Sequence, residues 1–480
     1  MRYSSSSRFA VQQEEVPMYV KAKDFAGKRT ALFGMTRTGK SNSLKKIIQA
    51  NEQMSNLSVL VLDKANESAE DLLEPFKNDA PKYPIGQIIF DMNGEYANKN
   101  LQDAGTAIFE IYEKKTERYS ITEKTGFKVM KINFYKEIEA GLELIKSYPS
   151  IADDNSKYMM GFKAVFLEKP EDYTTNQSAK IRYDRRVAVF KCILHAAKFK
   201  APSNMQQVSF TVSKEVMTEV DPKLDPSKGL NLDIATDWWE KFWAIYDTSK
   251  FATDYKTKNS REYADDDLKA LLVMLTRKRT SGGTIDCTGY RNLFAVEPQH
   301  THLSDTPFEE DILKALRSGR IVIADLSSGD EDLQRMYSER ITRKIFRDAM
   351  TRFTSNKPNN FIQFYFEEAH NLFPKKEDKD LSQIYNRLAK EGAKLNLGLV
   401  YATQEVSSIS GNILKATQNW FISHLNNEDE IKELRKYYDF SDFSDSLIRF
   451  SQDTDKGFVR VKTYSNAFVV PVQIDKFAAI

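Results

Sequence analysis

The sequence predicts an α/β fold in which a mostly parallel β-sheet carries helices on both faces. Short apolar runs recur along the chain, and helical patterns separate most of them. Short buried strands that alternate with helices are typical of parallel sheets, because each crossover places a helix on one face of the sheet. The predicted strands are Thr30–Phe33, Val59–Leu62, Ile88–Phe90, Ile321–Ala324, Phe361–Phe366 and Leu397–Ala402.

The middle of the chain has a different pattern. Helical segments such as Ile181–Lys198, Thr236–Tyr246 and Asp265–Arg279 alternate there with polar, proline-containing loops. This pattern indicates a mainly helical insertion between two parts of an α/β core. The predicted division is residues 1–25 for an N-terminal segment, 26–133 for the first part of the core, 134–304 for the insertion and 305–480 for the second part of the core.

The end of the chain returns to β character. Residues 457–462 and 467–472 are rich in valine and phenylalanine, and the polar segment Thr463–Asn466 joins them. Two such runs with a short polar connection predict a C-terminal β-hairpin.

Composition sets limits on the class of protein. Of 480 residues, 41% are hydrophobic and 29% are charged, which is enough for a buried core and a well-solvated surface. The net charge of +2 neither favours nor excludes nucleic acid as a partner. Cys192 and Cys287 do not form a CxxC pair, so no zinc ribbon or redox motif is expected. The first residues lack the apolar core of a signal peptide, and we expect a cytoplasmic protein without membrane contact.

Residues Gly34–Ser41 match the pattern GxxxxGK[ST] at every fixed position. The glycines allow the backbone to curl around a phosphate, and the following helix presents free N–H groups at its positive end. Lys40 supplies a charge for the β- and γ-phosphates, and the Ser41 hydroxyl is a ligand for Mg²⁺. The predicted nucleotide-binding residues are Gly34, Met35, Thr36, Arg37, Thr38, Gly39, Lys40, Ser41 and Asn42.

Acidic residues follow four of the predicted strands. In open parallel sheets, ligands gather at the carboxyl ends of the strands, so each acid is a candidate for holding the metal. Each is equally compatible with a solvated strand end or a helix cap. The pattern alone leaves all four open: Asp63, Asp91, Asp325 and Glu367.

Glu367 and Glu368 stand out among these acids because they are adjacent after a mostly apolar run. Neighbouring residues at a strand end point in different directions, so one can face a metal ion and the other an attacking water. Hydrolysis requires both roles. Gln404 ends the next predicted strand, where a side chain can contact the γ-phosphate or orient water. The alternative for Gln404 is an ordinary turn residue.

The ordered set of these segments resembles the HerA family, which comprises hexameric DNA-translocating ATPases related to FtsK. The P-loop alone is unspecific, whereas the other segments in this order are much more specific. The resemblance covers roughly residues 20–110 and 305–475, and it implies a RecA-like core. The segments that carry it are Phe33–Asn42, Phe90–Tyr96, Phe366–Asn371, Ala389–Lys394 and Val400–Gln404.

The resemblance also implies roles for matched residues. Lys40 and Ser41 would bind nucleotide and magnesium, and Glu367 would occupy the metal-side Walker B position. Glu368 would be the catalytic carboxylate, and Gln404 the sensor. It assigns no certain role to Asp91 and Glu95, and His370 is expected to be structural.

Two features depart from the family pattern. HerA-like chains commonly begin with a small β-barrel, but residues 1–25 are too few for one, which places a docking surface built on that barrel in doubt or indicates an incomplete form. Secondly, Ala393 stands where the family usually carries an arginine that acts on a neighbouring subunit's site. The candidates for this trans-acting charge are Arg387, Lys390 and Lys394, although a lysine is a point charge and no match for a guanidinium fork.

The function implied by the resemblance is a subunit of a hexameric ring that hydrolyses ATP with Mg²⁺ and moves double-stranded DNA as a translocase or helicase. It further implies work with a nuclease or another effector in DNA processing or anti-phage defence. The alternative is an oligomeric NTP-binding scaffold that regulates an effector without translocation, and a small-molecule kinase is a distant third. Stimulation of the ATPase by DNA distinguishes the first two.

The segment Phe373–Lys379 follows the Walker B strand and contains Pro374, which predicts a surface loop. If this loop lines the channel of a ring, Lys375 and Lys376 contact DNA phosphates without reading sequence. The alternative is a solvated basic tip whose charge is tempered by Glu377 and Asp378.

Overall fold

The computed structural model describes residues 2–3, 16–35, 38–62, 74–99, 106–303, 306–378, 380, 383–425, 427–437 and 457–477. Two compact units divide the chain. The first comprises Met1–Val129 together with Glu309–Ile480, and the second comprises Met130–Phe308. Thr36, Arg37, Asp63, Lys379 and Leu381 lie outside the described residues.

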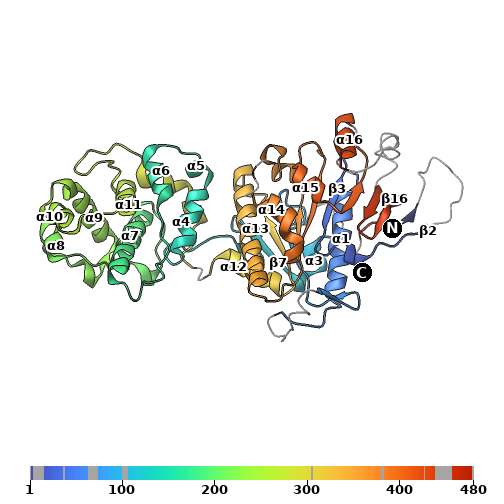
Figure 1. Cartoon of the computed structure of the whole chain (residues 1–480), viewed down its shortest axis with the longest axis horizontal. Helices are drawn as coiled ribbons and strands as arrows, with labels where there is room; N and C mark the ends of the chain where they lie inside the picture. The colour runs from blue at the N-terminus through green and yellow to red at the C-terminus, as the bar shows by residue number, and fades with distance from the viewer. Residues whose placement is uncertain are drawn as a thin grey trace. The chain divides into compact units, whose positions relative to one another are not determined.

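The first unit contains a twelve-stranded sheet with the order β2-β1-β16-β15-β14-β3-β13-β12-β6-β11-β7-β8 (Figure 1). Neighbours from β14 to β8 are parallel, and the remaining pairs are antiparallel. The parallel strands are β3 (Arg29–Phe33), β6 (Gly86–Asp91), β7 (Thr116–Ser120), β8 (Lys128–Val129), β11 (Ile321–Asp325), β12 (Ile362–Phe366), β13 (Leu397–Thr403) and β14 (Asn419–Ile422). The antiparallel strands are β1 (Arg2–Tyr3), β2 (Val16–Pro17), β15 (Phe458–Thr463) and β16 (Asn466–Gln473).

Helices cover both faces of this sheet, because alternate strand residues point to opposite sides. Tyr365 of β12 faces α1, where its hydroxyl accepts a hydrogen bond from Asn51 at 2.8 Å. Its neighbour Phe366 faces the other side and packs edge-on against Tyr385 of α14 at 5.4 Å. The predicted α/β fold, with a RecA-like parallel sheet between two helical layers, is confirmed.

Several helices of the first unit begin after a polar residue whose side chain accepts a hydrogen bond from a free N–H group of the first turn. Asp330, for example, accepts a hydrogen bond from the Leu333 N–H at the start of α13. Among the described residues, no helix combines the length and apolar character that crossing a membrane requires. The helices are α1 (Lys40–Ser55), α3 (Ile108–Ile111), α12 (Phe308–Arg317), α13 (Glu331–Thr354), α14 (Ile384–Glu391), α15 (Gly411–Ala416) and α16 (Glu428–Arg435).

One predicted strand is wrong, and several strands, among them β7 and β14 of the parallel sheet, were not predicted. Residues 59–62 form no strand; the side chains of Val59 and Val61 are exposed, and only Leu62 is buried. Strand β7 was missed because its sequence, TERYS, is mostly polar, and β14 because it has only four residues. Both lie inside the sheet, where pairing on two sides compensates for a weak local pattern.

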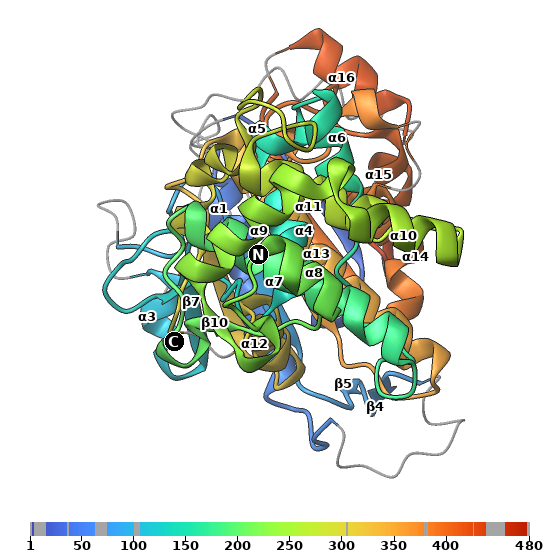
Figure 2. The same ribbon diagram turned by 90° about the vertical axis from the view of Figure 1, so that its left-hand side faces the viewer.

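The second unit is mainly helical, as the sequence predicts (Figure 2). Its core contains Trp238, Trp239 and Phe242 of α9; Phe242 packs against both tryptophans, and both tryptophans pack against Phe210. Helix α7 begins at Gln177, earlier than predicted, because the Asn176 side chain accepts hydrogen bonds from two N–H groups of its first turn. The helices are α4 (Ile138–Ser147), α5 (Pro149–Ala152), α6 (Lys157–Ala164), α7 (Gln177–Ala196), α8 (Lys214–Val220), α9 (Leu232–Ile245), α10 (Lys250–Asn259) and α11 (Asp266–Thr276).

The predicted C-terminal hairpin is confirmed. Strands β15 and β16 pair antiparallel, with Val461 opposite Val470 and a register irregularity between Val461 and Thr463. The hairpin extends the sheet beyond β14, which pairs on its other side with β3, the strand that leads into the P-loop.

Candidate nucleotide site

The P-loop connects the end of β3 to the start of α1, as its sequence pattern predicts. Gly39 has a φ of 98°, which a side chain rarely adopts, and a Cβ atom there would lie 3.0 Å from the Gly457 Cα. A Cβ on Gly34 would lie 2.6 Å from the Ser423 Cβ. Both glycines are therefore required by close contacts as well as by the turn itself.

The Lys40 side chain folds back onto its own loop. Its Nζ donates hydrogen bonds to the carbonyl oxygens of Gly34 at 2.5 Å and Met35 at 2.8 Å. Burial lowers the pKa of Lys40, and the nearby carboxylates of Glu368, Glu367 and Glu95 oppose that shift. The ammonium group thus lies within the loop and close to the acidic residues, where a phosphate could replace the carbonyls as its partner.

Asp91, the first strand-end acid that the structure describes, does not face a ligand. Its carboxylate accepts hydrogen bonds from the backbone N–H groups of Glu95 (2.9 Å), Tyr96 (2.8 Å) and Ala97 (2.7 Å). Burial raises the pKa of Asp91 to about 6. Asp91 therefore holds the turn at residues 94–97, and it acts on the site by positioning Glu95 and Tyr96.

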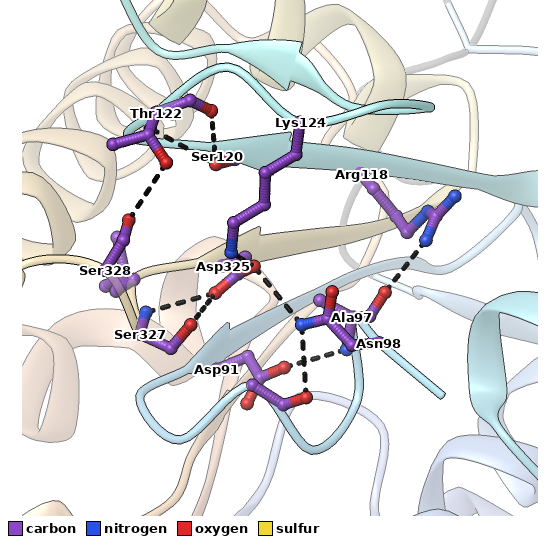
Figure 3. A network of polar contacts seen from close by, with 12 residues as sticks. Asp91, Ala97, Asn98, Arg118, Ser120, Thr122, Lys124, Asp325, Ser327 and Ser328 are labelled. Carbon is purple, nitrogen blue, oxygen red and sulfur yellow. Dashed lines mark hydrogen bonds and ion pairs between the residues drawn. The ribbon is translucent and has the colours of Figure 1, made fainter. Parts of the chain in front are cut away.

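Asp325, the second such acid, is paired inside the protein (Figure 3). Its carboxylate forms an ion pair with Lys124 at 2.6 Å and accepts hydrogen bonds from Ser327 and from the Asn98 side chain. Arg118 also donates to the Ala97 carbonyl at 2.9 Å. These contacts fix the same turn from its other side, so Asp325 has a structural role.

Glu367, the third strand-end acid that the structure describes, faces the P-loop. The Tyr96 hydroxyl donates a hydrogen bond of 2.6 Å to its Oε1 atom. Burial raises the pKa of Glu367 to about 7; the hydrogen bond from Tyr96 lowers that pKa and the nearby Glu95 carboxylate raises it. The Ser41 hydroxyl lies 3.5 Å from the Glu95 carboxylate, so Glu95 also belongs to the site.

These side chains fit a magnesium ion shared with nucleotide phosphates. Ser41, Glu95 and Glu367 offer hard oxygen atoms, and Mg²⁺ is usually held by one or two carboxylates together with phosphates and water. Among the described residues, no group of three or more His, Cys, Asp or Glu side chains could hold a metal by itself. A bound Mg²⁺ would neutralise charge on the phosphates during transfer.

Glu368 adopts a left-handed backbone conformation, with a φ of 47° and a ψ of 45°. Non-glycine residues in this region are uncommon, and they concentrate at functional sites. Because of this backbone conformation, the Glu368 side chain points in a different direction from the Glu367 side chain. Gln404 Nε2 lies 3.5 Å from the Glu368 Oε1 atom, and His370 Nδ1 lies 3.5 Å from its Oε2 atom. The structure thus brings Glu368 and Gln404 together at the ends of β12 and β13.

His370 also lies within hydrogen-bonding distance of a hydroxyl. Its Nδ1 atom is 3.1 Å from the Thr403 Oγ1 atom, which in turn accepts from the Glu405 N–H. His370 therefore links the segment after β12 to the end of β13, in keeping with the expected structural role.

The candidates for a trans-acting charge lie in and after α14. Arg387 is held within its own chain, since its guanidinium contacts Glu391 at 3.3 Å and lies 4.6 Å from the centre of the Phe346 ring. Lys390 and Lys394 are exposed, as is Ala393. Of the three, only the lysines are free of an ion pair among the described residues.

The segment after β12 is more ordered than a free surface loop. Lys375–Glu377 form a short 3₁₀ helix, and the Lys375 Nζ lies 3.2 Å from the Glu433 carboxylate of α16. The Asp378 carboxylate accepts a hydrogen bond from the Gly411 N–H at 3.0 Å. The segment is therefore attached to the connection that follows β13 and Gln404. Lys376 is exposed.

A P-loop on a parallel sheet, with acids at the carboxyl ends of neighbouring strands, defines the class of P-loop NTPases with a RecA-like core. A family model described as "Helicase HerA, central domain" matches residues 9–72. The DNA double-strand break repair helicase HerA of Sulfolobus acidocaldarius is 28% identical over 180 residues, which cover 35% of this chain and 34% of that protein. Part of the chain is therefore similar in sequence to HerA helicases.

Two further proteins are similar to this chain. HerA of Sulfurisphaera tokodaii is 27% identical over 173 residues, covering 35% of this chain and 34% of its own. The chain thus matches about a third of the length of these curated relatives. Among solved structures, the bacterial conjugative coupling protein TrwBdeltaN70 aligns with 97% of this chain and 91% of its own, at 10% identity and a TM-score of 0.43.

Proposed function

We propose that this protein is an ATP-hydrolysing subunit of a ring-forming DNA translocase or helicase, most simply a homohexamer. The observation that carries the proposal is the meeting of the P-loop with Glu367 and Glu368. Glu367 lies on the P-loop side of β12 under Tyr96, and Glu368 turns away towards Gln404. Two carboxylates with separate surroundings support separate roles in binding and in hydrolysis.

In this proposal, ATP binds with Mg²⁺, and each residue has one task. Lys40 exchanges its loop carbonyls for the β- and γ-phosphates, and Ser41 with Glu367 holds the metal. Glu368 accepts the proton of the attacking water, and Gln404 orients that water or contacts the γ-phosphate. The contacts of Gln404 and His370 with Glu368 support this arrangement, because they fix the direction of the carboxylate.

A neighbouring subunit would complete each site in the ring. Lys390 and Lys394 are exposed, which supports a role towards another copy of the chain, whereas Arg387 is engaged with Glu391. Mass photometry with ATP and Mg²⁺, at micromolar protein and with any partner supplied, should detect a ring. A population of monomers only would contradict the proposal.

Double-stranded DNA is the proposed substrate, and the work of the ring is proposed to serve a nuclease or another effector in DNA processing or anti-phage defence. The similarity to proteins named DNA double-strand break repair helicases supports a role on DNA. The test is the ATPase rate with and without duplex DNA. A translocase should be stimulated, and a rate independent of DNA would contradict translocation.

The exposed Ala393 favours a second candidate function. A site without the expected arginine would hydrolyse ATP slowly, which suits an oligomeric scaffold that uses nucleotide to regulate an effector. Such a scaffold should still bind ATP and assemble, while its slow turnover should not respond to DNA. Restoring the guanidinium by Ala393→Arg should then raise turnover in assembled protein.

A further inference from the structure

The helical unit contains a cavity of about 830 Å³ that is separate from the P-loop. The first turns of α7 line it, together with Tyr255 of α10 and the segment 261–266 that leads into α11. Its volume lies in the range of small-molecule sites, which is about 300–1,000 Å³. Arg182, Arg185 and Arg261 line this cavity together with three acidic residues, Glu262, Asp265 and Asp266.

Arg185 is the most informative of the three, because it is only 9% exposed. Its Nε atom donates a hydrogen bond to the Thr211 carbonyl at 2.8 Å, and its guanidinium lies 4.3 Å from the centre of the Tyr263 ring. Within the described part of the chain, no carboxylate forms an ion pair with it. Burying a charge without an ion pair is costly; burial lowers the pKa of Arg185, and the Asp265 carboxylate opposes that shift only in part. An anion in the cavity would offset that cost.

Arg182 and Arg261 extend this positive surface. Arg182 lies one helical turn before Arg185 on α7 and donates to the Ser178 hydroxyl at 3.1 Å. The Arg261 guanidinium lies 5.9 Å from the centre of the Tyr255 ring. Among the residues that the structure describes, neither arginine has an ion pair. Planar guanidinium forks match the oxygen atoms of phosphate, and three of them around one cavity favour a phosphorylated ligand.

The remaining lining suits the rest of such a ligand. The rings of Tyr255 and Tyr263 lie 5.2 Å apart at 82°, and both residues line the cavity. The acids of the lining are partly engaged elsewhere: Glu262 pairs with Lys256 and Lys269. Asp265 accepts the Leu268 N–H at 2.9 Å. Their free lone pairs, and the exposed Asp266, offer acceptors for the N–H groups of a base.

We propose that this cavity binds a nucleoside phosphate, with the phosphate on the three arginines and the base against Tyr255 and Tyr263. The inference is independent of the function proposed for the P-loop, because the lining residues all belong to the helical unit. The same chemistry is found in a free mononucleotide and at the phosphorylated end of a nucleic-acid strand, and the experiment separates these two sources.

The test uses the full chain with Lys40→Ala, which weakens nucleotide binding at the P-loop. Isothermal titration with AMP, GMP, CMP, UMP, inorganic phosphate and a 5′-phosphorylated oligonucleotide should detect one site per chain. Adding Arg182→Glu and Arg261→Glu should weaken binding at least about tenfold, the loss expected from one charged hydrogen bond. Arg291→Glu, an exposed arginine of the same unit outside the cavity, is the matched control and should leave affinity unchanged.

Each outcome decides the proposal. Binding of a mononucleotide that is lost with the two arginines supports a free ligand, and binding of the oligonucleotide alone supports a strand end. Equal affinity for inorganic phosphate would overturn the assignment of a nucleoside. Affinities weaker than about 1 mM for every probe, or binding that survives the double substitution in folded protein, would overturn the site itself.

Discussion

The Tyr96 hydroxyl donates a 2.6 Å hydrogen bond to the Glu367 carboxylate, although 271 positions separate the two residues in the chain. Tyr96 is fully buried and lies in the turn that Asp91 holds. Glu367 ends the strand on which the proposed metal site depends. A buried neutral donor thus stabilises the charged form of a carboxylate that burial would otherwise keep protonated.

Replacing Tyr96 by Phe removes this donor while it keeps the ring in place. Without the hydrogen bond, the pKa of Glu367 should rise above about 7. The ionised form, which would bind the metal, then becomes dominant only at higher pH. We therefore expect the acid limb of kcat/KM against pH to move upward by about one pH unit, with a matching loss of activity near neutral pH and recovery in alkaline buffer.

Tyr119→Phe is the matched control, because Tyr119 lies on β7 of the same sheet and its hydroxyl is hydrogen-bonded to Asp311 of α12 instead of Glu367. It should leave the pH profile in place. An unchanged acid limb in Tyr96→Phe would show that this hydrogen bond does not set the protonation of Glu367.

Asp91→Asn tests whether a strand-end acid can act by holding a turn. Asn retains one acceptor oxygen, whereas the Asp91 carboxylate accepts three backbone N–H groups. We expect the free energy of unfolding to fall by about 1–3 kcal/mol, the usual cost of leaving a buried donor without its partner. Chemical denaturation measures this loss, and titration with ATP and Mg²⁺ should show weaker binding because Glu95 is no longer fixed beside Ser41.

Glu95→Gln separates these two effects. It removes a charge near the proposed metal but leaves the Asp91 hydrogen bonds intact, so binding should weaken with little change in stability. Full stability in Asp91→Asn would argue against the positioning role.

Much of the fold could be predicted because its central strands are short, continuous apolar runs. The runs at β3, β6, β11, β12 and β13 are buried on both faces, and their pattern is visible without neighbours. Strands β7 and β14 depend on neighbours for pairing, whereas the apolar run at residues 59–62 is not part of any strand. Local sequence does not contain that tertiary context.

Some residues of the candidate site could likewise be predicted from the sequence, and others could not. The P-loop and the tandem acids Glu367 and Glu368 are visible in the sequence because their chemistry requires fixed residue types at fixed spacing. The roles of Asp91, Glu95 and Tyr96 were not predictable, since they depend on a turn that brings distant residues together. The Asp-Met-Asn-Gly-Glu-Tyr segment is visible in the sequence, but only contacts across the sheet distinguish an acid that holds a turn from an acid that binds a metal.

The third prediction concerns Lys375 and Lys376, the candidates for contact with DNA. Lys375 is partly compensated by Glu433, whereas Lys376 has no ion pair among the described residues. If the segment contacts DNA, the Lys375→Ala, Lys376→Ala double variant should lose DNA affinity and DNA-stimulated ATPase activity, while basal activity and assembly persist. Lys376→Ala alone should account for most of the loss.

The measurement is DNA affinity at several salt concentrations. The slope of log K against log salt should decrease in magnitude by about 0.9 for each lost phosphate contact. Lys223→Ala with Lys228→Ala, two exposed lysines of the helical unit, is the control for net charge. A wild-type affinity and salt slope in the double variant would mean that these lysines form a solvated tip.

The central claim is that Glu368 is the base for ATP hydrolysis at this P-loop. The most direct test compares ATP binding and single-turnover hydrolysis in wild type, Glu368→Gln and Lys40→Ala, with Glu405→Gln as an exposed control nearby. Glu368→Gln keeps the shape but removes the base, so ATP should bind normally while hydrolysis slows at least about a hundredfold. Lys40→Ala should instead weaken binding. Near-normal hydrolysis by Glu368→Gln would contradict the account.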